Sequence, residues 1–535
     1  MIPVENAHSG FAMSRAVRDA YREGKEDETL SPLVLVDHNG NPTGRFKTGD
    51  SVIFYNIRGE REVELTKSLT DRSFDKFPVE RDLNLHFATM IEYQKDLNVH
   101  VAFPPDGSIE GTLSDVIAEN NLKQVKITES EKAIHVGFFL NGKKNGVLPG
   151  EEKLIVPTRK NITLFDEAPE MSIAEVTRAV IDKIKDDSYH FVFANFANVD
   201  VVGHVENENA IIRAIEAVDR STGQVIDEAL REGIVAIVTS DHGTVEKWYY
   251  PDGSIDTGHT DSPVPFVLVH STPGKVSLRE GGELADIAPT VLELMGIRQP
   301  DHMTGRSLLR KHPPVRPKGK KGRVLLLILD GWGENNTLHG NLIARADTPT
   351  MDRLKKTFPY TTLNAAGEAV GLPAGTVGNS EAGHLHIGAG RRIYSDRAKI
   401  DRSIADRSFF LNDVFLRAIR TARDTGSSLH LLGIVSFFSS HGSLPHLFAL
   451  MDMAREEGMH DTYIHAMLGR RGEMPESGAH YIKKIEERCK EISLGKVVSV
   501  IGRYWSLDRE ENWDRVEKTY RMLIYGEGIP VTERS

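Results

Sequence analysis

The sequence has a single cysteine and no long apolar run. With only Cys489, an intrachain disulfide, a cysteine-based zinc site and an iron–sulfur cluster are excluded. The longest aliphatic run, 324–329, is far shorter than the roughly 20 residues that cross a bilayer, and the N-terminus lacks the charged-then-apolar layout of a signal peptide. We therefore expect a cytoplasmic protein without a membrane anchor.

The sequence also has no excess of positive charge. Its 66 lysines and arginines stand against 77 aspartates and glutamates, a net charge of −11. A general nucleic-acid binder needs a basic surface that neutralises phosphates, so this class is excluded, and any anionic ligand must be held by a local basic cluster. The 21 histidines indicate that a metal site here would use imidazole and carboxylate ligands.

Short apolar runs alternate with amphipathic stretches along most of the 535 residues, which predicts an α/β fold with a largely parallel, doubly wound sheet. The clearest strand candidates are 191–196, 234–239, 264–269 and 324–329. Ser172 and Glu175 have the spacing of a capping box before a helix, and a second helix over 284–295 is expected to end at Gly296. The segment 312–323, rich in proline, glycine and basic residues, is a predicted flexible, solvated linker.

Metal-type side chains follow three of the strand candidates and come just before the fourth. In open α/β sheets the carboxyl ends of the strands meet at one edge, so these residues are expected to converge. Singly, each would be explained as a turn residue, a helix cap or an ordinary polar group. Together, three carboxylates and three histidines favour a two-metal site, and its residues are Asp200, His204, Asp241, His242, His259 and Asp330.

Ser380 is the candidate nucleophile. It lies in GLPAGTVGNSEAGHLHIGAGR, where glycines permit a tight turn that brings a hydroxyl against a phosphate or a metal. The alternative is that Ser380 only caps the following helix. An esterase or lipase would carry G-x-S-x-G, whereas Gly378 and Gly383 stand one residue too far apart for that motif.

Basic residues embedded in otherwise structured segments are the candidates for binding an anion. Each of them alone is more typical of a solvated surface cation. Arg58 differs because it directly follows the strand-like run 51–56. The candidates are Arg58, Arg61, Lys132, Arg471, Arg503 and Arg509.

The combination of motifs resembles the cofactor-independent phosphoglycerate mutases, which are relatives of alkaline phosphatase. The motifs are DGWG at Asp330, GNSEAGH at Ser380, NFANVDVVGH at Asp200, TSDHG at Asp241 and TGHTDSPVPF at His259, together with GDSVIFYNIRGER, IGRY and LREGGELADIAPTVLELMGI. The resemblance covers nearly the whole chain. It implies an alkaline-phosphatase-like sheet domain and a second, smaller α/β transferase domain.

The order of these motifs differs from that of the family, in which DGWG comes first. Here it follows the MTGRSLL segment of 303–309, so the sequence resembles a circular permutant whose customary ends are fused through the linker. The expected metal-binding domain is 108–394, including the linker 312–323, and the expected substrate-binding domain combines 1–107 with 395–535. The two ends of the chain are expected to lie side by side.

The resemblance also implies roles for single residues. One metal is assigned to Asp200, His204 and His259, and the other to Asp330, Ser380, Asp241 and His242. Manganese is the implied ion, with zinc or magnesium as alternatives. The implied substrate-binding residues are His441, Arg471, Arg503, Arg509, Arg58, Arg61 and Lys132.

The implied activity is interconversion of 2- and 3-phosphoglycerate by a monomer of glycolysis and gluconeogenesis, through a phosphoserine and without 2,3-bisphosphoglycerate. Ser380 would attack the phosphate while the metals and Lys132 stabilise its oxygens. Domain closure would exclude water. No nucleic acid and no membrane takes part.

Two segments depart from the family. Gly472 stands where the family has an acid/base aspartate, with Glu473 adjacent, and Phe437 and Phe438 replace a flexible acidic turn before His441. Three alternatives therefore stay open: a mutase for another phosphorylated or phosphonylated hydroxy acid, a metal-dependent phosphatase, and a degenerate binding protein.

Overall fold

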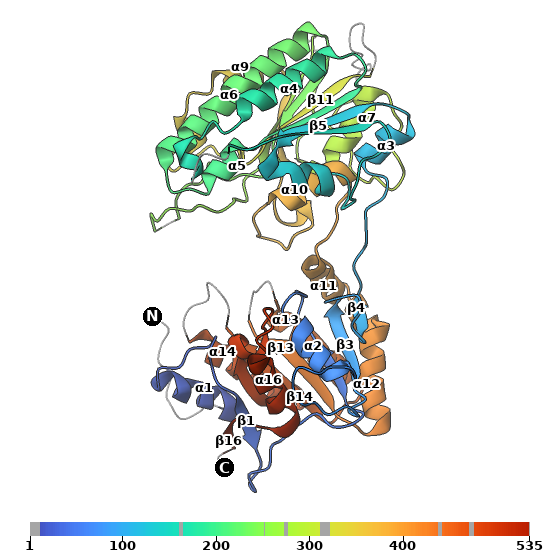
Figure 1. Cartoon of the computed structure of the whole chain (residues 1–535), viewed down its shortest axis with the longest axis vertical. Coiled ribbons are helices and arrows are strands. Elements are labelled where there is room, and N and C mark those ends of the chain that lie inside the picture. Colours follow the sequence, from blue (N-terminus) through green and yellow to red (C-terminus); the bar gives the residue numbers. More distant parts are fainter. Residues whose placement is uncertain are drawn as a thin grey trace. The chain divides into compact units, whose positions relative to one another are not determined.

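The chain folds into two α/β units, each built around an eight-stranded sheet (Figure 1). The computed structural model describes residues 11–159, 164–250, 252–271, 276–310, 322–436, 441–469 and 476–533. Unit 1 comprises Met1–Pro105 and Lys399–Ser535, and unit 2 comprises Asp106–Ala398. The predicted α/β class with two domains is confirmed.

The sheet of unit 2 is mostly parallel. Its strands, in spatial order, are β10 (Gly282–Glu283), β12 (Tyr360–Asn364), β9 (Val264–Val269), β8 (Val235–Thr239), β11 (Val324–Leu329), β7 (Phe191–Phe196), β5 (Gln124–Glu129) and β6 (Glu151–Val156). β11 lies between β7 and β8 and is parallel to both, whereas β9 is antiparallel to β8 and β12. All four strands expected from the sequence are present.

Helices cover both faces of this sheet, as a doubly wound fold requires (Figure 1). Leu325 and Leu327 of β11 pack in one buried apolar cluster with residues of α4 and α6, while Leu326 and Ile328 pack in another with residues of α3 and α7. The helices of unit 2 are α3 (Leu113–Glu119), α4 (Ile173–Lys185), α5 (Asn198–Gly203), α6 (Glu208–Arg231), α7 (Ile287–Met295), α8 (Leu342–Arg345), α9 (Pro349–Thr357) and α10 (Ser380–Ala389).

Unit 1 has its own sheet and one large apolar core. The spatial order is β16 (Ile529–Thr532), β1 (Leu33–Val36), β15 (Lys496–Gly502), β14 (Thr462–Leu468), β13 (Leu429–Ile434), β2 (Ser51–Phe54), β3 (His86–Ile91) and β4 (His100–Phe103). The strands from β15 to β4 are parallel to one another. From the β13–β2 pair, chain order runs outward through β14 and β15 on one side and through β3 and β4 on the other, so the topological switch point of these parallel strands lies between β13 and β2.

The helices of unit 1 flank this sheet, and α11 spans the boundary between the units. They are α1 (Ala12–Arg22), α2 (Val63–Thr70), α11 (Asp396–Ala405), α12 (Asp413–Thr425), α13 (Leu444–Glu456), α14 (Ser477–Ile492), α15 (Arg503–Ser506) and α16 (Trp513–Tyr525). Within the described ranges, none of the helices combines the length and the apolar character that a membrane crossing requires.

Three local expectations have different outcomes. Helix α7 ends at Gly296 with a left-handed φ of 74°, as predicted, but 284–286 form a 3-10 turn before it. The capping box at Ser172 is wrong, because its hydroxyl donates to Pro157 O, 3.0 Å away, instead of capping α4. Residues 312–321 of the predicted linker lie outside the described residues, and only positions 322 and 323 are described. Arg323 is not solvated but buried, with its guanidinium bonded to the carbonyls of Ile184, Asp186 and Tyr189.

The two chain ends are expected to lie side by side, but residues 1–10 and 534–535 lie outside the described residues. Within the described residues, β1 and β16 pair in parallel, with Leu33 opposite Ile529.

Candidate metal centre and arginine cluster

Three aspartates reach one point in unit 2 from the carboxyl ends of three adjacent strands. Asp330 directly follows β11, Asp241 is separated from the end of β8 by one residue, and Asp200 lies in α5 after β7. The backbone N–H of Asp200 donates to Asp330 O at 3.1 Å, which ties two of these strand ends together. All three carboxylates are buried. The convergence expected from the parallel sheet is therefore present.

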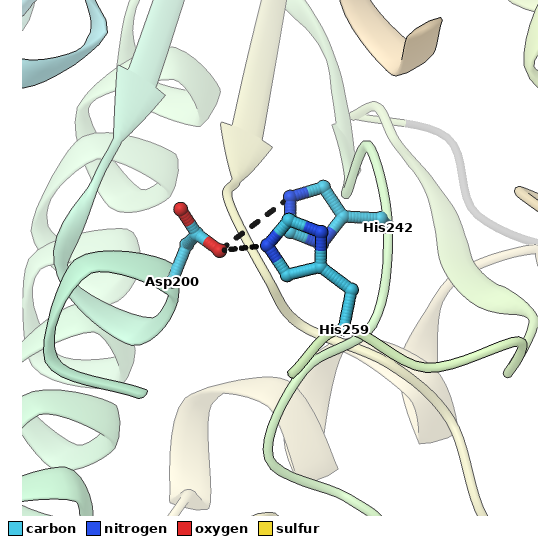
Figure 2. A group of neighbouring side chains, drawn as sticks. All are labelled: Asp200, His242 and His259. Carbon is cyan, nitrogen blue, oxygen red and sulfur yellow. Dashed lines mark ion pairs between the residues drawn. The ribbon is translucent and has the colours of Figure 1, made fainter. Parts of the chain in front are cut away.

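Asp200, His242 and His259 form the first group of candidate metal ligands, and Figure 2 shows both imidazoles facing the Asp200 carboxylate. Asp200 Oδ1 lies 3.0 Å from His259 Nε2 and 3.6 Å from His242 Nε2. His204 Nε2 lies 3.4 Å from the same oxygen. The three residues of the first predicted site, Asp200, His204 and His259, thus lie together, and His242 of the second predicted site lies beside them.

Backbone carbonyls orient these histidine rings. Nδ1 of His259 contacts Gly378 O at 3.0 Å, Nδ1 of His204 contacts Thr257 O at 2.7 Å, and Nδ1 of His242 contacts Gly243 O at 3.1 Å. A ring that donates its Nδ1 proton to a carbonyl presents an unprotonated Nε2, which is the form that binds a metal.

Asp241, Asp330 and His384 form the second group. His384 Nδ1 lies 3.2 Å from Asp241 Oδ2 and contacts Ser380 O at 2.9 Å. Asn195 Nδ2 donates to Asp330 Oδ2 at 2.7 Å and lies 3.1 Å from His384 Nε2. The sequence analysis missed His384 and Asn195, although the four-residue spacing of Ser380 and His384 on α10 places them on one helix face.

Ser380 is the first residue of α10, and its hydroxyl points at the carboxylates. Its Oγ lies 2.6 Å from Lys132 Nζ, 2.9 Å from His242 Nε2 and 3.3 Å from Asp330 Oδ1. The helix is capped by Asn379, whose side chain accepts from Ala382 N at 2.8 Å. The alternative that Ser380 caps the helix is therefore wrong.

Lys132 is buried at the centre of this arrangement. Besides Ser380, its ammonium group contacts Asp200 Oδ2 and Asp330 Oδ1, both at 2.7 Å. Burial alone would lower the pKa of Lys132, but the neighbouring aspartates outweigh it and raise this pKa. Burial likewise opposes protonation of His242, yet without a bound cation the charges of Asp241, Asp330 and Asp200 raise its pKa to about 10.

The residues fit divalent cations. Three buried carboxylates surround one lysine, so the site holds more negative than positive side-chain charge, which is costly to bury without a counter-ion. Asp241 Oδ2 is buried, and its close contact among the described residues, His384 Nδ1 at 3.2 Å, lacks the geometry of a hydrogen bond. Carboxylate oxygens and imidazole nitrogens are suitable ligands for manganese or zinc.

Unit 1 gathers arginines from three segments. Burial and the positive charges of Arg509, Arg503 and Arg58 lower the pKa of Arg61, so each of these three guanidinium groups lies within electrostatic range of Arg61. Arg61 Nη1 donates to Leu507 O at 3.0 Å, and Arg509 Nη1 pairs with Glu60 Oε2 at 2.9 Å. An arginine cluster at strand ends can hold a carboxylate or a phosphate.

The other expected residues of unit 1 have two outcomes. His441 is buried, and its Nδ1 lies 3.4 Å from Glu62 Oε1, a contact that the sequence analysis missed. Arg471 lies outside the described residues, as do the positions at which the sequence departs from the resembled family, namely Phe437, Phe438, Gly472 and Glu473.

Known proteins match the chain in two blocks. Residues 28–299 match the family described as the Metalloenzyme superfamily, and residues 400–534 match the family described as the BPG-independent PGAM N-terminus. Two curated relatives are called 2,3-bisphosphoglycerate-independent phosphoglycerate mutase. The one from Listeria monocytogenes is 39% identical over 55% of this chain and 57% of its own length. The one from Moorella thermoacetica is 40% identical over 57% of this chain and 58% of its own length.

The chain thus spans less than three-fifths of the length of these relatives. A solved structure of Leishmania mexicana phosphoglycerate mutase, at low cobalt concentration, is 29% identical over 51% of this chain and 53% of that one, with a TM-score of 0.36. The match to the first family covers about half of the chain. The chain therefore belongs to the Metalloenzyme superfamily, in keeping with its two groups of metal-type ligands.

Proposed function

We propose that this protein is a metal-dependent phosphotransferase that interconverts 2- and 3-phosphoglycerate through a phosphoserine at Ser380. The observation that carries the proposal is the setting of the Ser380 hydroxyl, which lies within 3.3 Å of Lys132, His242 and Asp330. A buried serine beside a lysine and a metal-type ligand set is suited to attack on phosphorus. The substrate is proposed from the names of the relatives.

Two divalent ions, most suitably Mn²⁺, are proposed, with Zn²⁺ or Mg²⁺ as alternatives. Asp200, His204 and His259 would hold one ion, and Asp330, Asp241, His242 and Ser380 the other. Bound there, such ions lower the pKa of a coordinated hydroxyl and neutralise phosphoryl charge. His384 and Asn195 would keep the Asp241 and Asp330 carboxylates in position.

The proposed reaction has two halves. In the first, Ser380 Oγ forms a bond to phosphorus while the bond between phosphorus and the glycerate oxygen breaks, and Lys132 stabilises the non-bridging oxygens. In the second, the other glycerate hydroxyl takes the phosphoryl group and Ser380 is restored. The arginines of unit 1 would bind the glycerate carboxylate in bidentate fashion. The enzyme is proposed to act as a cytoplasmic monomer without 2,3-bisphosphoglycerate.

The test is incubation of manganese-loaded protein with 3-phosphoglycerate, followed by ³¹P NMR. Formation of 2-phosphoglycerate without free phosphate, together with a phosphoserine at Ser380 by mass spectrometry, is the expected result. Ser380→Ala should abolish both signals, and Ser108→Ala, which removes an exposed hydroxyl of unit 2, should change neither. Free phosphate alone would identify a phosphatase, and turnover of neither kind would refute phosphoglycerate as the substrate.

A permuted order of the two domains is also proposed. It is supported by the match of an N-terminal family segment to residues 400–534, after the match to residues 28–299. A rearranged chain that joins residue 535 to residue 1 and opens within 311–321 should fold and keep its activity. An insoluble or inactive rearranged chain would count against the permutation.

A further inference from the structure

Glu62 is a buried carboxylate in unit 1 that does not serve the helix it precedes. It stands at the N-terminal boundary of α2, yet its side chain makes no capping hydrogen bond there. The carboxylate is fully buried. A buried charge is costly unless hydrogen-bond donors satisfy it. The groups that contact the Glu62 carboxylate therefore indicate what this residue does in the structure.

Three groups contact this carboxylate. Asn56 Nδ2 donates to Oε1 at 2.7 Å, the Arg61 backbone N–H donates to Oε2 at 3.1 Å, and His441 Nδ1 lies 3.4 Å from Oε1. Asn56 is itself fixed, because its Oδ1 accepts from Ile434 N at 2.8 Å. The orientation of the Asn56 amide is thereby set, so that its N–H points at Glu62.

The backbone of His441 is held as well. Its carbonyl accepts from Ile57 N at 2.7 Å, which joins the segment after β13 to the segment after β2. Glu62 and His441 thus meet beyond the carboxyl ends of β2 and β13, the two strands between which the chain order of this sheet reverses. Ligands of open α/β sheets bind at such a point.

We propose that Glu62 is the positioning residue for His441, and that His441 Nε2 exchanges a proton with a hydroxyl of the bound hydroxy acid. A carboxylate that accepts the Nδ1 proton fixes the tautomer of the ring and stabilises the imidazolium. The O–H bond of the substrate breaks as an N–H bond forms at Nε2, and the proton returns to a substrate oxygen in the other half of the reaction. This inference rests on the proposed function.

The nearby arginines are consistent with this role. Arg61, next to Glu62 in the chain, belongs to the arginine cluster described above. A small anion bound by that cluster would be held close to the Glu62–His441 pair within the same unit. Recognition of the acid group and proton exchange with its hydroxyl would then come from one set of strand ends.

The test compares Glu62→Gln with Glu64→Gln. Glu64 is a matched control, because it is a buried carboxylate in the first turn of the same helix and accepts from Glu511 N at 3.0 Å. We expect Glu62→Gln to lower kcat for phosphoglycerate by roughly 10²-fold while KM changes by less than about threefold, and Glu64→Gln to change neither. Glu62→Leu, which removes the acceptor altogether, should lower kcat further.

The second readout is ¹⁵N NMR of histidine-labelled full-length protein, with the His441 signals assigned through His441→Asn. The wild-type ring should carry its proton on Nδ1, and Glu62→Gln should reduce that population. A wild-type ring protonated on Nε2, or equal kcat in the Glu62 and Glu64 variants, would overturn the inference. Absence of mutase turnover in the wild type would instead refute the proposed function, and the NMR result would still decide the pairing.

Discussion

The two units share the same sheet architecture, but the side chains at their strand ends carry opposite charges. In each, parallel strands deliver polar side chains to one edge of the sheet. Unit 2 collects three buried aspartates and four histidines there, whereas unit 1 has a buried Glu62–His441 pair and, next to Glu62 in the chain, Arg61, which feels the charges of three further arginines. The strand-end residues, not the fold, therefore account for the difference in side-chain charge between the two units.

Removal of metal should have the largest effect and should separate the units. Treatment with a chelator is expected to abolish phosphoryl transfer, and to destabilise unit 2 because its buried carboxylates lose their counter-ions. A site saturated at 100 times its Kd stabilises the fold by about 2.7 kcal/mol. Hydrogen exchange should become faster in β7, β8 and β11 and stay unchanged in β13 and β14. Full activity in a metal-free preparation would contradict the metal site.

Two buried lysines in unit 2 allow a loss of catalytic rate to be distinguished from a loss of folding stability. Lys132→Met is expected to lower kcat by on the order of 10²- to 10³-fold, because a charge beside the reacting oxygens is lost. Lys126 is also fully buried, but it pairs with Glu151 at 2.7 Å. Lys126→Met should therefore cost about 3–5 kcal/mol of stability and leave kcat of the folded protein unchanged. Urea unfolding and steady-state kinetics on both variants measure the difference.

The reverse pattern would be informative. If Lys132→Met only destabilised unit 2 and kept its kcat, Lys132 would be a structural counter-ion to the aspartates and would have no role in the transfer.

Within unit 1, Arg61 should affect binding more than turnover. Arg61→Lys keeps the charge but removes the fork that grips a carboxylate, so KM is expected to rise by about 10-fold with a smaller change in kcat. Arg72→Lys provides the control, since Arg72 is exposed and contacts Asn84. Equal KM values for the two variants would exclude Arg61 from the substrate site.

The aspartates of unit 2 were predictable from the sequence because the strands before them are recognisable as apolar runs. Asp330 and Asp241 follow such runs within one or two positions, so parallel pairing alone brings them together. His384 was not predicted because it lies inside α10, where a histidine is more typical of helix packing. Its contacts with Asp241 and Asn195 depend on how α10 docks, which local sequence does not encode.

Glu62 could not be predicted for a different reason. It lies in the charged segment Arg58–Glu62, where exposure is the usual expectation, and its partner His441 is 379 residues away. The failed capping box at Ser172 has the same origin, because the tertiary partner Pro157 O took the hydroxyl that the local pattern assigned to the helix. Tertiary contacts thus override local sequence patterns in both units, at Glu62 in unit 1 and at Ser172 in unit 2.

The smallest expected effect concerns the pH dependence of unit 1. A buried chain of hydrogen bonds links Asp50 Oδ2 to His430 Nε2 (3.0 Å), His430 Nδ1 to His465 Nε2 (3.0 Å), and His465 Nδ1 to Ser499 Oγ (2.8 Å). Burial lowers the pKa of both histidines. Asp50 opposes this shift at His430, while the positive charges of Arg45 and Lys47 reinforce it.

Because both folded-state pKa values lie below the unfolded value of about 6.5, the unfolded chain binds more protons as the pH falls. The stabilisation is therefore fully present above pH ~6.5 and declines below it, by at most about 1.4 kcal/mol per pH unit for each histidine. Urea unfolding followed by hydrogen exchange in β13 and β14 should show this decline between pH 7 and 5. His465→Gln should reduce the slope and the exposed His38→Gln should not, whereas equal slopes in the two variants would place the pH sensitivity of unit 1 elsewhere.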